Sequence, residues 1–400
     1  MANLLYLVHR LPYPPNKGDK VRSYHLLKHL AARHRVFLGT FVDDPEDEVH
    51  LDTVRSLCAG FHAARLSPRG ARIASLSGLL SGEALTLRYY RDAGLARWVG
   101  DVLAREAIDA AVVFSSSMAQ YAEAHAGLPM LVDFVDVDSA KWSEYAGQHA
   151  WPMSWLYRRE GERLLAYERA VAVQARRSFF VTDKETALFH RLAPESAVTV
   201  EPLCNGVDAA YFTPDAALPT PYRADECPLV FTGAMDYWPN VDAVSWFVAE
   251  VLPALRARRP ELRLHIVGRS PTAAVQALAG DAVSVSGTVP DVRPYLQHAR
   301  VVVAPLRLAR GIQNKVLEAM AMARPVVAAD SCVGAIEATP GSDLLAAGDA
   351  AGYVSQIEAL LADPARADAI GRAGREAVLR RYNWTARLAP LDAVLEDVVG

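Results

Sequence analysis

Lys315 and Glu318 are the residues whose positions most need a chemical explanation. Both belong to a predicted helix from about residue 312 to residue 322, which lies between the apolar runs Val301–Ala304 and Val326–Ala329. Such β-branched runs are typical of buried parallel strands. A lysine in the first turn opposes the helix dipole, whose positive end lies there, and a bound anion would reverse that cost.

The start of this helix is therefore predicted to hold a diphosphate. Backbone amides around Ile312 to Asn314 lack intrahelical partners, and the cations Arg307 and Lys315 lie close to them. Glu318, one turn further along at about 1.5 Å per residue, would accept hydrogen bonds from both ribose hydroxyls. The alternative is an i,i+3 surface ion pair between Lys315 and Glu318.

This stretch resembles the donor-site helix of the retaining GT-B glycosyltransferases of family 4, in the branch that reads K-x-x-E-A-M-A. Residues 205–214 are similar to the family's interdomain signature N-G-V-D-x-x-x-F-x-P, and Phe231-Thr232-Gly233 to its first donor-domain strand and turn. The similarity is greatest to the sugar transferases of exosortase (PEP-CTERM) exopolysaccharide clusters. The donor-binding residues that the motifs and the resemblance imply are Gly18, Gly233, Arg310, Gly311, Gln313, Asn314 and Glu318.

Two positions depart from the family pattern. Arg310 stands where the broader family has the first Glu of E-x7-E, and Ala323 replaces the usual glycine before x-Pro-Val. The family's Glu accepts from hydroxyls of the donor sugar, whereas a guanidinium has donors only. Arg310 is therefore expected to add positive charge near the diphosphate.

The composition predicts a globular protein with two domains. The chain has 400 residues, of which 52% are hydrophobic and 22% charged, and its net charge of −4 includes no long basic blocks of the kind that bind nucleic acid. Its four cysteines lack C-x-x-C spacing, which argues against a zinc site and for a reducing compartment. No apolar run approaches the roughly 18 residues of a spanning helix. We expect a cytoplasmic protein whose membrane contact is peripheral.

The first half begins with an apolar run, residues 4–8, that predicts a strand and not a signal peptide. A proline-rich loop follows, and Asp19 is expected to cap a helix that begins near Lys20. Gly18 would then permit close backbone approach at that helix start. The resemblance implies that this loop faces the donor phosphates; an ordinary Pro-Gly loop is the alternative.

Residues 65–97 carry six arginines against two acids, a net charge of 6 − 2 = +4, with Ile73, Leu76, Leu79 and Leu80 at helical spacing. A basic amphipathic surface of this kind binds anionic membranes. A solvated helix that packs its apolar stripe on the domain is the alternative. Residues 151–177 are interpreted as a long helix with a mostly solvated face.

Asp136 and Asp138 follow a predicted strand over residues 130–135. Their D-x-D spacing imitates a metal site of another glycosyltransferase fold, but two acids at a strand end are a weak metal signal. The resemblance implies that Asp136 contacts sugar or acceptor hydroxyls, and we expect neither a metal nor a cofactor.

Strands alternate with helices in both halves, which predicts parallel doubly wound sheets. The expected fold class is α/β, with the GT-B arrangement of two Rossmann-like domains facing a central cleft. The expected boundaries are 1–205 for the acceptor-side domain, 206–382 for the nucleotide-sugar domain, and 383–400 for a helix crossing back. Gly233 and Gly268 follow strands of the second domain without forming G-x-G-x-x-G, and Asn240 is expected to cap the helix over residues 240–257.

The predicted function is hexosyl transfer from a nucleotide-diphosphate sugar to a glycan or polyprenyl-linked acceptor, an activity of EC class 2.4, in exopolysaccharide or other surface glycan synthesis. Asp136, Arg307 and Lys315 are the predicted catalytic residues, since without a metal the leaving diphosphate must be met by cations and amides. The resemblance alone implies retention of anomeric configuration. Alternatives are a nucleotide-sugar epimerase of the same fold and a catalytically silent sugar-nucleotide binder.

Overall fold

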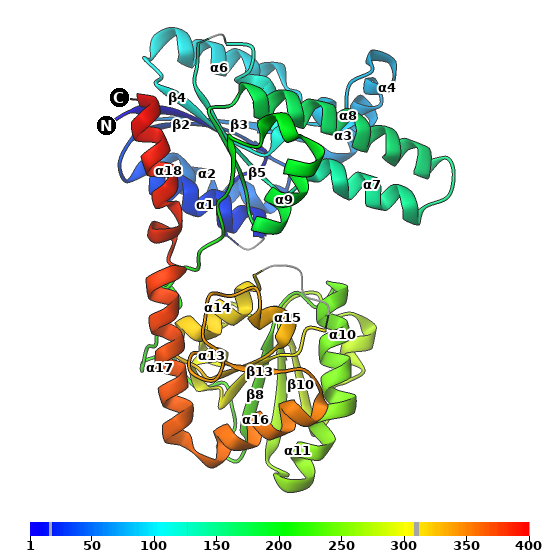
Figure 1. The fold of residues 1–400 in the computed structure, drawn as a ribbon, viewed down its shortest axis with the longest axis vertical. Coiled ribbons are helices and arrows are strands. Elements are labelled where there is room, and N and C mark those ends of the chain that lie inside the picture. Colours follow the sequence, from blue (N-terminus) through cyan, green and yellow to red (C-terminus); the bar gives the residue numbers. More distant parts are fainter. Residues whose placement is uncertain (16–17, 126, 308–311, 400) are drawn as a thin grey trace. The chain divides into compact units, whose positions relative to one another are not determined.

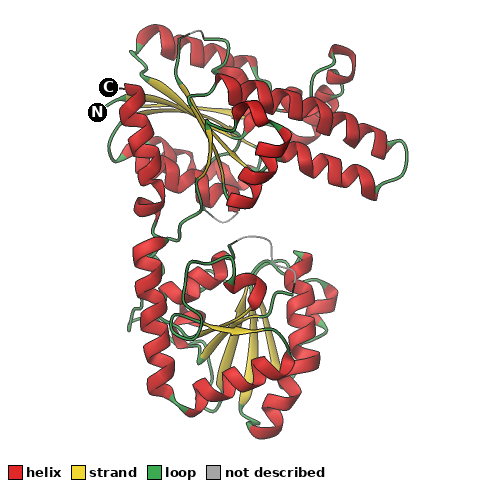
Figure 2. Cartoon of the chain, in the orientation of Figure 1, coloured by secondary structure: helices red, strands yellow, loops and turns green. Residues whose placement is uncertain are grey.

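The computed structural model describes residues 1–15, 18–125, 127–307 and 312–399. The chain folds into two compact units, one of Met1–Asn205 with Arg387–Gly400 and the other of Gly206–Ala386. Each unit is an α/β domain built on one sheet, and each is described by itself below (Figures 1 and 2).

Unit 1 contains a seven-stranded parallel sheet in the order β3-β2-β1-β4-β5-β6-β7. Its strands are β1 (Asn3–Val8), β2 (Arg35–Val42), β3 (Gly60–Arg65), β4 (Ala110–Phe114), β5 (Met130–Val135), β6 (Arg177–Phe180) and β7 (Val200–Pro202). The strand order reverses between β1 and β4, and doubly wound sheets bind ligands at the carboxyl ends of the strands beside such a reversal.

The helices of unit 1 are α1 (Gly18–Ala31), α2 (Leu51–Arg55), α3 (Pro68–Ser75), α4 (Gly78–Ser81), α5 (Leu85–Tyr89), α6 (Ala93–Arg105), α7 (Asp138–Gln148), α8 (Met153–Gln174) and α9 (Asp183–Leu192). Single 3-10 turns occupy Pro45–His50, Ser116–Tyr121 and Pro194–Ser196. Helices α7 and α8 lie side by side as a hairpin that extends away from the sheet (Figure 1). The last helix, α18 (Trp384–Val399), joins unit 1 from Arg387 onward.

Unit 2 contains a six-stranded parallel sheet in the order β10-β9-β8-β11-β12-β13. Its strands are β8 (Cys227–Thr232), β9 (Leu262–Val267), β10 (Val283–Gly287), β11 (Val301–Ala304), β12 (Val326–Ala329) and β13 (Leu345–Ala347). Here the strand order reverses between β8 and β11. The loop and helix that follow β11 are the stretch in which the sequence predicts the diphosphate site.

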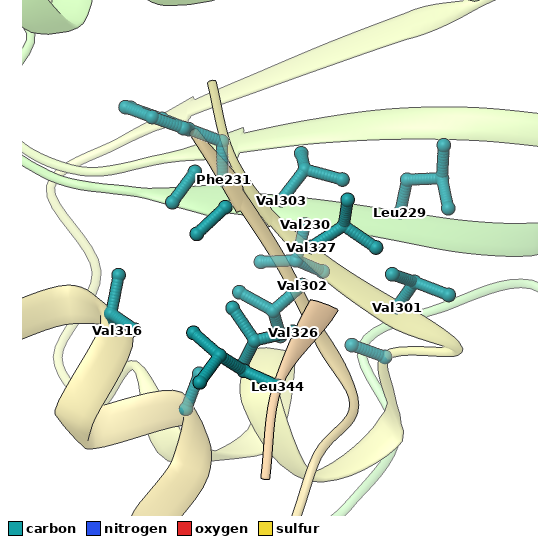
Figure 3. Packing of buried hydrophobic residues seen from close by; sticks show 14 of the residues in the cluster. Leu229, Val230, Phe231, Val301, Val302, Val303, Val316, Val326, Val327 and Leu344 are labelled. Atoms are coloured by element: carbon teal, nitrogen blue, oxygen red, sulfur yellow. The ribbon is translucent and has the colours of Figure 1, made fainter. Parts of the chain in front are cut away.

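The helices of unit 2 are α10 (Trp238–Trp246), α11 (Leu252–Arg258), α12 (Ala273–Gln276), α13 (Arg293–His298), α14 (Asn314–Ala321), α15 (Asp330–Val333), α16 (Ala350–Ala362) and α17 (Pro364–Arg381), with a π-helical turn at Phe247–Val251. The core forms because β8, β11 and β12 are apolar on both faces, as expected for central parallel strands. Figure 3 shows Val302, Val326 and Leu344 of this core close together, and Val316 of α14 belongs to the same cluster.

The segment that joins the units is fixed at both ends. Arg22, buried in α1, forms an ion pair with Asp133 at 2.7 Å and donates to Asn205 Oδ1 at 3.0 Å. A Cβ on Gly206 would lie 2.9 Å from the carbonyl oxygen of Tyr382, which explains why glycine follows Asn205. Packing therefore accounts for Asn205 and Gly206, the first two residues of the N-G-V-D signature.

Residues 45–55 form a 3-10 turn followed by the short helix α2, and Asp47 turns inward to pair with buried Lys20 at 2.6 Å. Two predicted helix caps were wrong. Asp19 does not cap α1, because that helix begins at Gly18. Asn240 does not cap α10, because that helix begins two residues earlier at Trp238.

The predicted solvated face of α8 is also wrong in part, because two of its glutamates are buried. Glu160 accepts from the amides of Leu85 and Thr86 at the start of α5, at 2.6 and 2.8 Å. Glu168 accepts from Ser139 Oγ at 2.5 Å in the first turn of α7, and burial raises the pKa of Glu168 to about 8. These carboxylates tie α5 and α7 to α8.

Within the described residues, none of the helices combines the length and the apolar character needed to cross a bilayer.

Candidate functional site

Helix α14 follows β11 at the carboxyl edge of the unit 2 sheet. Val316, Leu317 and Met320 are buried against the core, which leaves Lys315 and Glu318 half-buried on the other side of the helix. Gln313 precedes the helix without a side-chain cap, and the first turn contains no acidic residue. The first-turn amides and the helix dipole thus favour an anion at this end.

Lys315 lies at the point where the strand order reverses. Its Nζ donates to Asn240 Oδ1 at 2.5 Å and lies 4.4 Å from the ring centroid of Phe231. Burial lowers the pKa of Lys315 to about 8, although the charge of Glu318 opposes the change. In the described part of the chain no carboxylate comes within 4.0 Å of this ammonium, so the predicted alternative, an ion pair with Glu318, does not form.

Glu318 lies one turn further along α14 and accepts no hydrogen bond from the described residues. Burial raises its pKa to about 7, and the charge of Lys315 opposes that rise. A carboxylate that is half-buried without a donor has lost part of its hydration without compensation. Its two oxygens are available to a ligand that carries hydroxyl groups.

Two glycines allow backbone to pass beside Lys315. Gly233, directly after β8, has φ 154°, and a Cβ there would lie 3.0 Å from Lys315 Nζ and 2.8 Å from Asn240 Nδ2. A Cβ on Gly268, directly after β9, would lie 1.7 Å from the carbonyl oxygen of Gly233. Both positions therefore require glycine for the ends of β8 and β9 to meet.

The other predicted donor residues differ in their surroundings. Arg307 donates to Asp242 through Nε at 3.1 Å and Nη2 at 2.5 Å, so its charge is already compensated. Asn314 is the first residue of α14. Gly18 is the first residue of α1 in unit 1, where an added Cβ would meet nothing within 4 Å. Arg310 and Gly311 lie outside the described residues.

A cavity of about 560 Å³ opens at the carboxyl edge of the unit 1 sheet, beside the reversal between β1 and β4. His9 follows β1, Ser115 follows β4, and Val135 ends β5. Ser115 and Val135 both have positive φ, 75° and 70°, and the β5–β6 register shifts at Val135. Left-handed backbone at a β-branched residue is costly and clusters at ligand sites.

Asp136 and Asp138 line this cavity and hold a lysine between them. Lys141 Nζ donates to Asp136 at 2.8 Å and to Asp138 at 2.9 Å. Burial alone would lower the pKa of Lys141, but the two carboxylates have the larger effect, so the pKa of Lys141 is raised. No group of three His, Cys, Asp or Glu side chains suited to a metal occurs among the described residues.

Helices α5, α7 and α8 form the outer wall of the cavity with aromatic side chains. These are Tyr89, Trp142, Tyr145 and Tyr157, and Tyr90, directly after α5, adds to them. The rings of Trp142 and Tyr157 lie 5.4 Å apart and those of Trp142 and Tyr145 6.0 Å apart. An aromatic wall with a few convergent polar groups is typical of a small-molecule pocket.

His9 and Asp19 form a polar pair in the same cavity. His9 Nε2 lies 3.5 Å from Asp19 Oδ2, which also accepts from Arg10 at 2.8 Å. Burial would raise the pKa of Asp19, but the hydrogen bond from His9 and the charges of His9 and Arg10 hold it well below the usual range. The His9 ring stacks on Phe114 with centroids 5.8 Å apart.

Comparisons with known proteins agree with this architecture. Residues 226–363 match the family of glycosyl transferases group 1. Sucrose-phosphate synthase from Thermosynechococcus elongatus is similar over 100% of this chain and 99% of its own, with 19% identity and a TM-score of 0.68. The chain has the GT-B fold.

Two further GT-B structures are similar over nearly the whole chain. HepE from Anabaena, solved with UDP, covers 99% of this chain and 100% of its own, at 14% identity and a TM-score of 0.66. WaaG, a glycosyltransferase involved in lipopolysaccharide biosynthesis, covers 99% and 100%, at 17% identity and a TM-score of 0.60. No curated protein sequence matches the chain. The family match and the shared GT-B fold support a glycosyltransferase enzyme.

Several contacts of the site could not be predicted from the sequence. Asn240, Asp242 and Phe231 act on cations that are 65 to 84 positions away in sequence, and only the strand order brings them together. The aromatic wall is drawn from three separate helices. The sequence singled out Asn240 as a helix cap, but the structure places its side chain on Lys315.

Proposed function

We propose that the protein transfers a hexosyl group from a nucleoside-diphosphate sugar held by unit 2, with retention and without a metal cofactor. The observation that carries this proposal is Lys315, a half-buried ammonium at a helix start that has a neutral amide and an aromatic ring for partners. A diphosphate would supply the negative charge that these partners lack.

In this proposal the bond between the anomeric carbon and the diphosphate oxygen breaks, and the leaving diphosphate gains negative charge. Lys315 and the amides of the first turn of α14 would stabilise that charge. Glu318 would accept from the ribose hydroxyls. Arg307 could contribute only if the ligand displaced Asp242 or shared the guanidinium with it.

The donor is tested first with uridine nucleotides, because HepE has been solved with UDP and with UDP-glucose. Calorimetric titration of UDP should show that Lys315→Ala binds about 10- to 150-fold more weakly than wild type, as expected for a charge-assisted contact of about 1.5–3 kcal/mol. The matched control is the exposed Lys184→Ala in unit 1. If no nucleoside diphosphate binds wild type, or if Lys315→Ala binds UDP as well as wild type does, the donor assignment is wrong.

The acceptor is proposed to bind in the unit 1 cavity. Its aromatic wall suits the apolar face of a sugar ring, and Asp136, Asp138 and Lys141 offer polar partners to hydroxyl groups. The acceptor class that we propose is a glycan or a polyprenyl-linked glycan, in exopolysaccharide or other surface glycan synthesis.

The surface around the cavity supports a lipid-linked acceptor and peripheral contact with an anionic membrane from the cytoplasmic side. Ile73, Leu80 and Trp151 are exposed by 73%, 94% and 80%, so the apolar stripe of α3 and α4 is not packed on the domain as the alternative prediction required. Of the six nearby arginines, Arg65, Arg88 and Arg91 pair with glutamates, whereas Arg69 and Arg72 are exposed without an ion pair in the described structure.

Sedimentation with vesicles tests the membrane contact. Wild type should sediment with vesicles that contain phosphatidylglycerol and not with phosphatidylcholine alone. The triple variant Ile73→Ser, Leu80→Ser, Trp151→Ser should stay in the supernatant. Control changes at two equally exposed valines of unit 1, Val49→Ser and Val198→Ser, should not alter sedimentation. Equal sedimentation of both variants would remove this surface from the proposal.

A further inference from the structure

A second cavity lies at the opposite edge of the unit 2 sheet from Lys315. It has a volume of about 750 Å³, within the roughly 300–1,000 Å³ of small-molecule sites. Its floor is formed by the amino ends of β8, β11 and β12, at Cys227, Arg300 and Arg324. Helices α16 and α17 contribute the apolar Leu360, Leu361 and Ala367, so the cavity belongs to one domain.

Arg300 and Arg324 occupy matching positions on neighbouring strands. Each lies two residues before a paired position of the parallel ladder, where Val302 is opposite Val326. Burial lowers the pKa of Arg324; Asp368 opposes this effect and the positive charge of Arg300 adds to it. Two neighbouring guanidinium charges repel one another unless a negative charge compensates them.

Among the described residues, the charge of Asp368, which also lines the cavity, supplies part of that compensation. The other arginines of the cavity have acidic neighbours: Arg223 pairs with Asp225 at 2.6 Å, and Arg259 lies 3.9 Å from Glu261. By contrast, no carboxylate of the described chain lies within 4.0 Å of Arg300 or Arg324. The Nε of Arg324 donates to the carbonyl oxygen of Met322 at 3.3 Å, which leaves the two Nη groups for a ligand.

We propose that this cavity is a binding site for a small phosphate-bearing molecule, held by Arg300 and Arg324. Two neighbouring guanidinium groups present several N–H donors in a planar fork that matches phosphate oxygens. The site is separate from the candidate donor site, because Lys315 lies in the first turn of α14 and Arg324 lies beyond the other end of that helix. The helix rises about 9 Å from Lys315 to Ala321, its last residue. The proposal therefore stands or falls independently of the proposed function.

Cys227 provides a reporter inside the cavity, since its half-buried thiol lies in the cavity wall. Inorganic phosphate and glucose 6-phosphate are the probes, and alkylation of each cysteine by N-ethylmaleimide is followed by peptide mass spectrometry. Either probe should slow alkylation of Cys227 at least threefold, and leave Cys58 and Cys204 in unit 1 unchanged. Glucose without phosphate should protect nothing.

Variants complete the test. In the double variant Arg300→Gln, Arg324→Gln, phosphate should no longer protect Cys227, whereas the exposed Arg372→Gln of α17 should behave as wild type. Lys315→Ala should also leave this protection intact, which separates the site from the donor site. If phosphate and glucose 6-phosphate fail to protect Cys227, or protect it equally in the double variant, the two arginines are solvated surface charges and the proposal is wrong.

Discussion

Lys315 Nζ donates a hydrogen bond of 2.5 Å to Asn240 Oδ1, joining the first turn of α14 to the first turn of α10 across the sheet reversal. Asn240 is fixed in turn, because its Nδ2 donates to the carbonyl oxygen of Ala234 at 2.8 Å. A neutral amide orients the ammonium without cancelling its charge. The cation is therefore held in place and its charge stays available to an anion.

The affinity for a nucleoside diphosphate should fall as the pH rises through 8. Burial lowers the pKa of Lys315 to about 8, so above that pH the unliganded protein increasingly holds a neutral amine. Titrations of UDP between pH 7 and pH 9.5 should show at least a fivefold loss of affinity. Lys315→Arg should lose less over the same range, because a guanidinium stays charged. A flat profile in wild type would contradict the role of Lys315.

Replacing Glu318 with Gln should stabilise the free protein while weakening nucleotide binding. Its pKa is raised by burial to about 7, above the unfolded value of about 4.3. The ionised carboxylate therefore costs stability fully above pH 7, and the cost disappears as the pH falls towards 4. We expect a gain at pH 8 of about 1 kcal/mol after allowance for solvent screening, or roughly 2–4 °C in melting temperature.

Two measurements separate this expectation from a surface effect. The exposed Glu250→Gln of unit 2 should leave the melting temperature unchanged. If Glu318 binds the ribose, wild type should prefer UDP to its 2′,3′-dideoxy analogue, and Glu318→Gln should discriminate less. Equal binding of both nucleotides by wild type would remove the ribose role.

Gly18→Ala should show whether glycine is needed at this position for ligand binding or for packing of the folded protein. An added Cβ at this helix start meets no atom of the described residues within 4 Å, and alanine favours a helix by up to about 1 kcal/mol over glycine. The variant should therefore melt at the same temperature as wild type or slightly higher. If Gly18 faces the donor phosphates, kcat/KM should still fall at least tenfold. Unchanged kinetics would mean that the glycine belongs to an ordinary loop.

Transfer should persist in excess EDTA. Asp136 and Asp138 are bridged by Lys141, whose ammonium neutralises the carboxylates that a divalent cation would otherwise use. Rates with and without the chelator should agree within twofold. Loss of activity on chelation, with recovery on adding Mn²⁺, would show that a metal takes part.

The strands could be predicted because their signal is local. Runs such as Val301–Ala304 and Met130–Val135 are mostly apolar, and the structure places strands at those same bounds. Helix ends were less predictable, as Asp19 and Asn240 show. Both have side chains that often cap helices. In the structure, however, Asp19 accepts a hydrogen bond from Arg10, and Asn240 accepts one from Lys315.

Side chains of the candidate site that lie on one segment could be singled out from the sequence, whereas those that the fold brings together could not. Lys315 and Glu318 lie on one helix, so the helix dipole and the spacing of the two residues along the sequence were enough to single them out. Glu160 and Glu168 had the spacing of surface residues, and their burial follows from the contacts of α8 with α5 and α7. A local sequence pattern does not indicate that a carboxylate accepts hydrogen bonds from another helix.

Acceptor-dependent turnover tests the central claim most directly. Wild type and Lys315→Ala would be incubated with a panel of nucleotide sugars, with and without a lipid-linked glycan extract, and free nucleoside diphosphate would be measured. We predict that at least one nucleotide sugar releases its nucleoside diphosphate only when acceptor is present, with a configuration-retained product, and that Lys315→Ala releases less than a hundredth as much. Conversion of the nucleotide sugar to an isomer with its diphosphate intact would show an epimerase, and release that Lys315→Ala leaves unchanged would contradict the proposed mechanism.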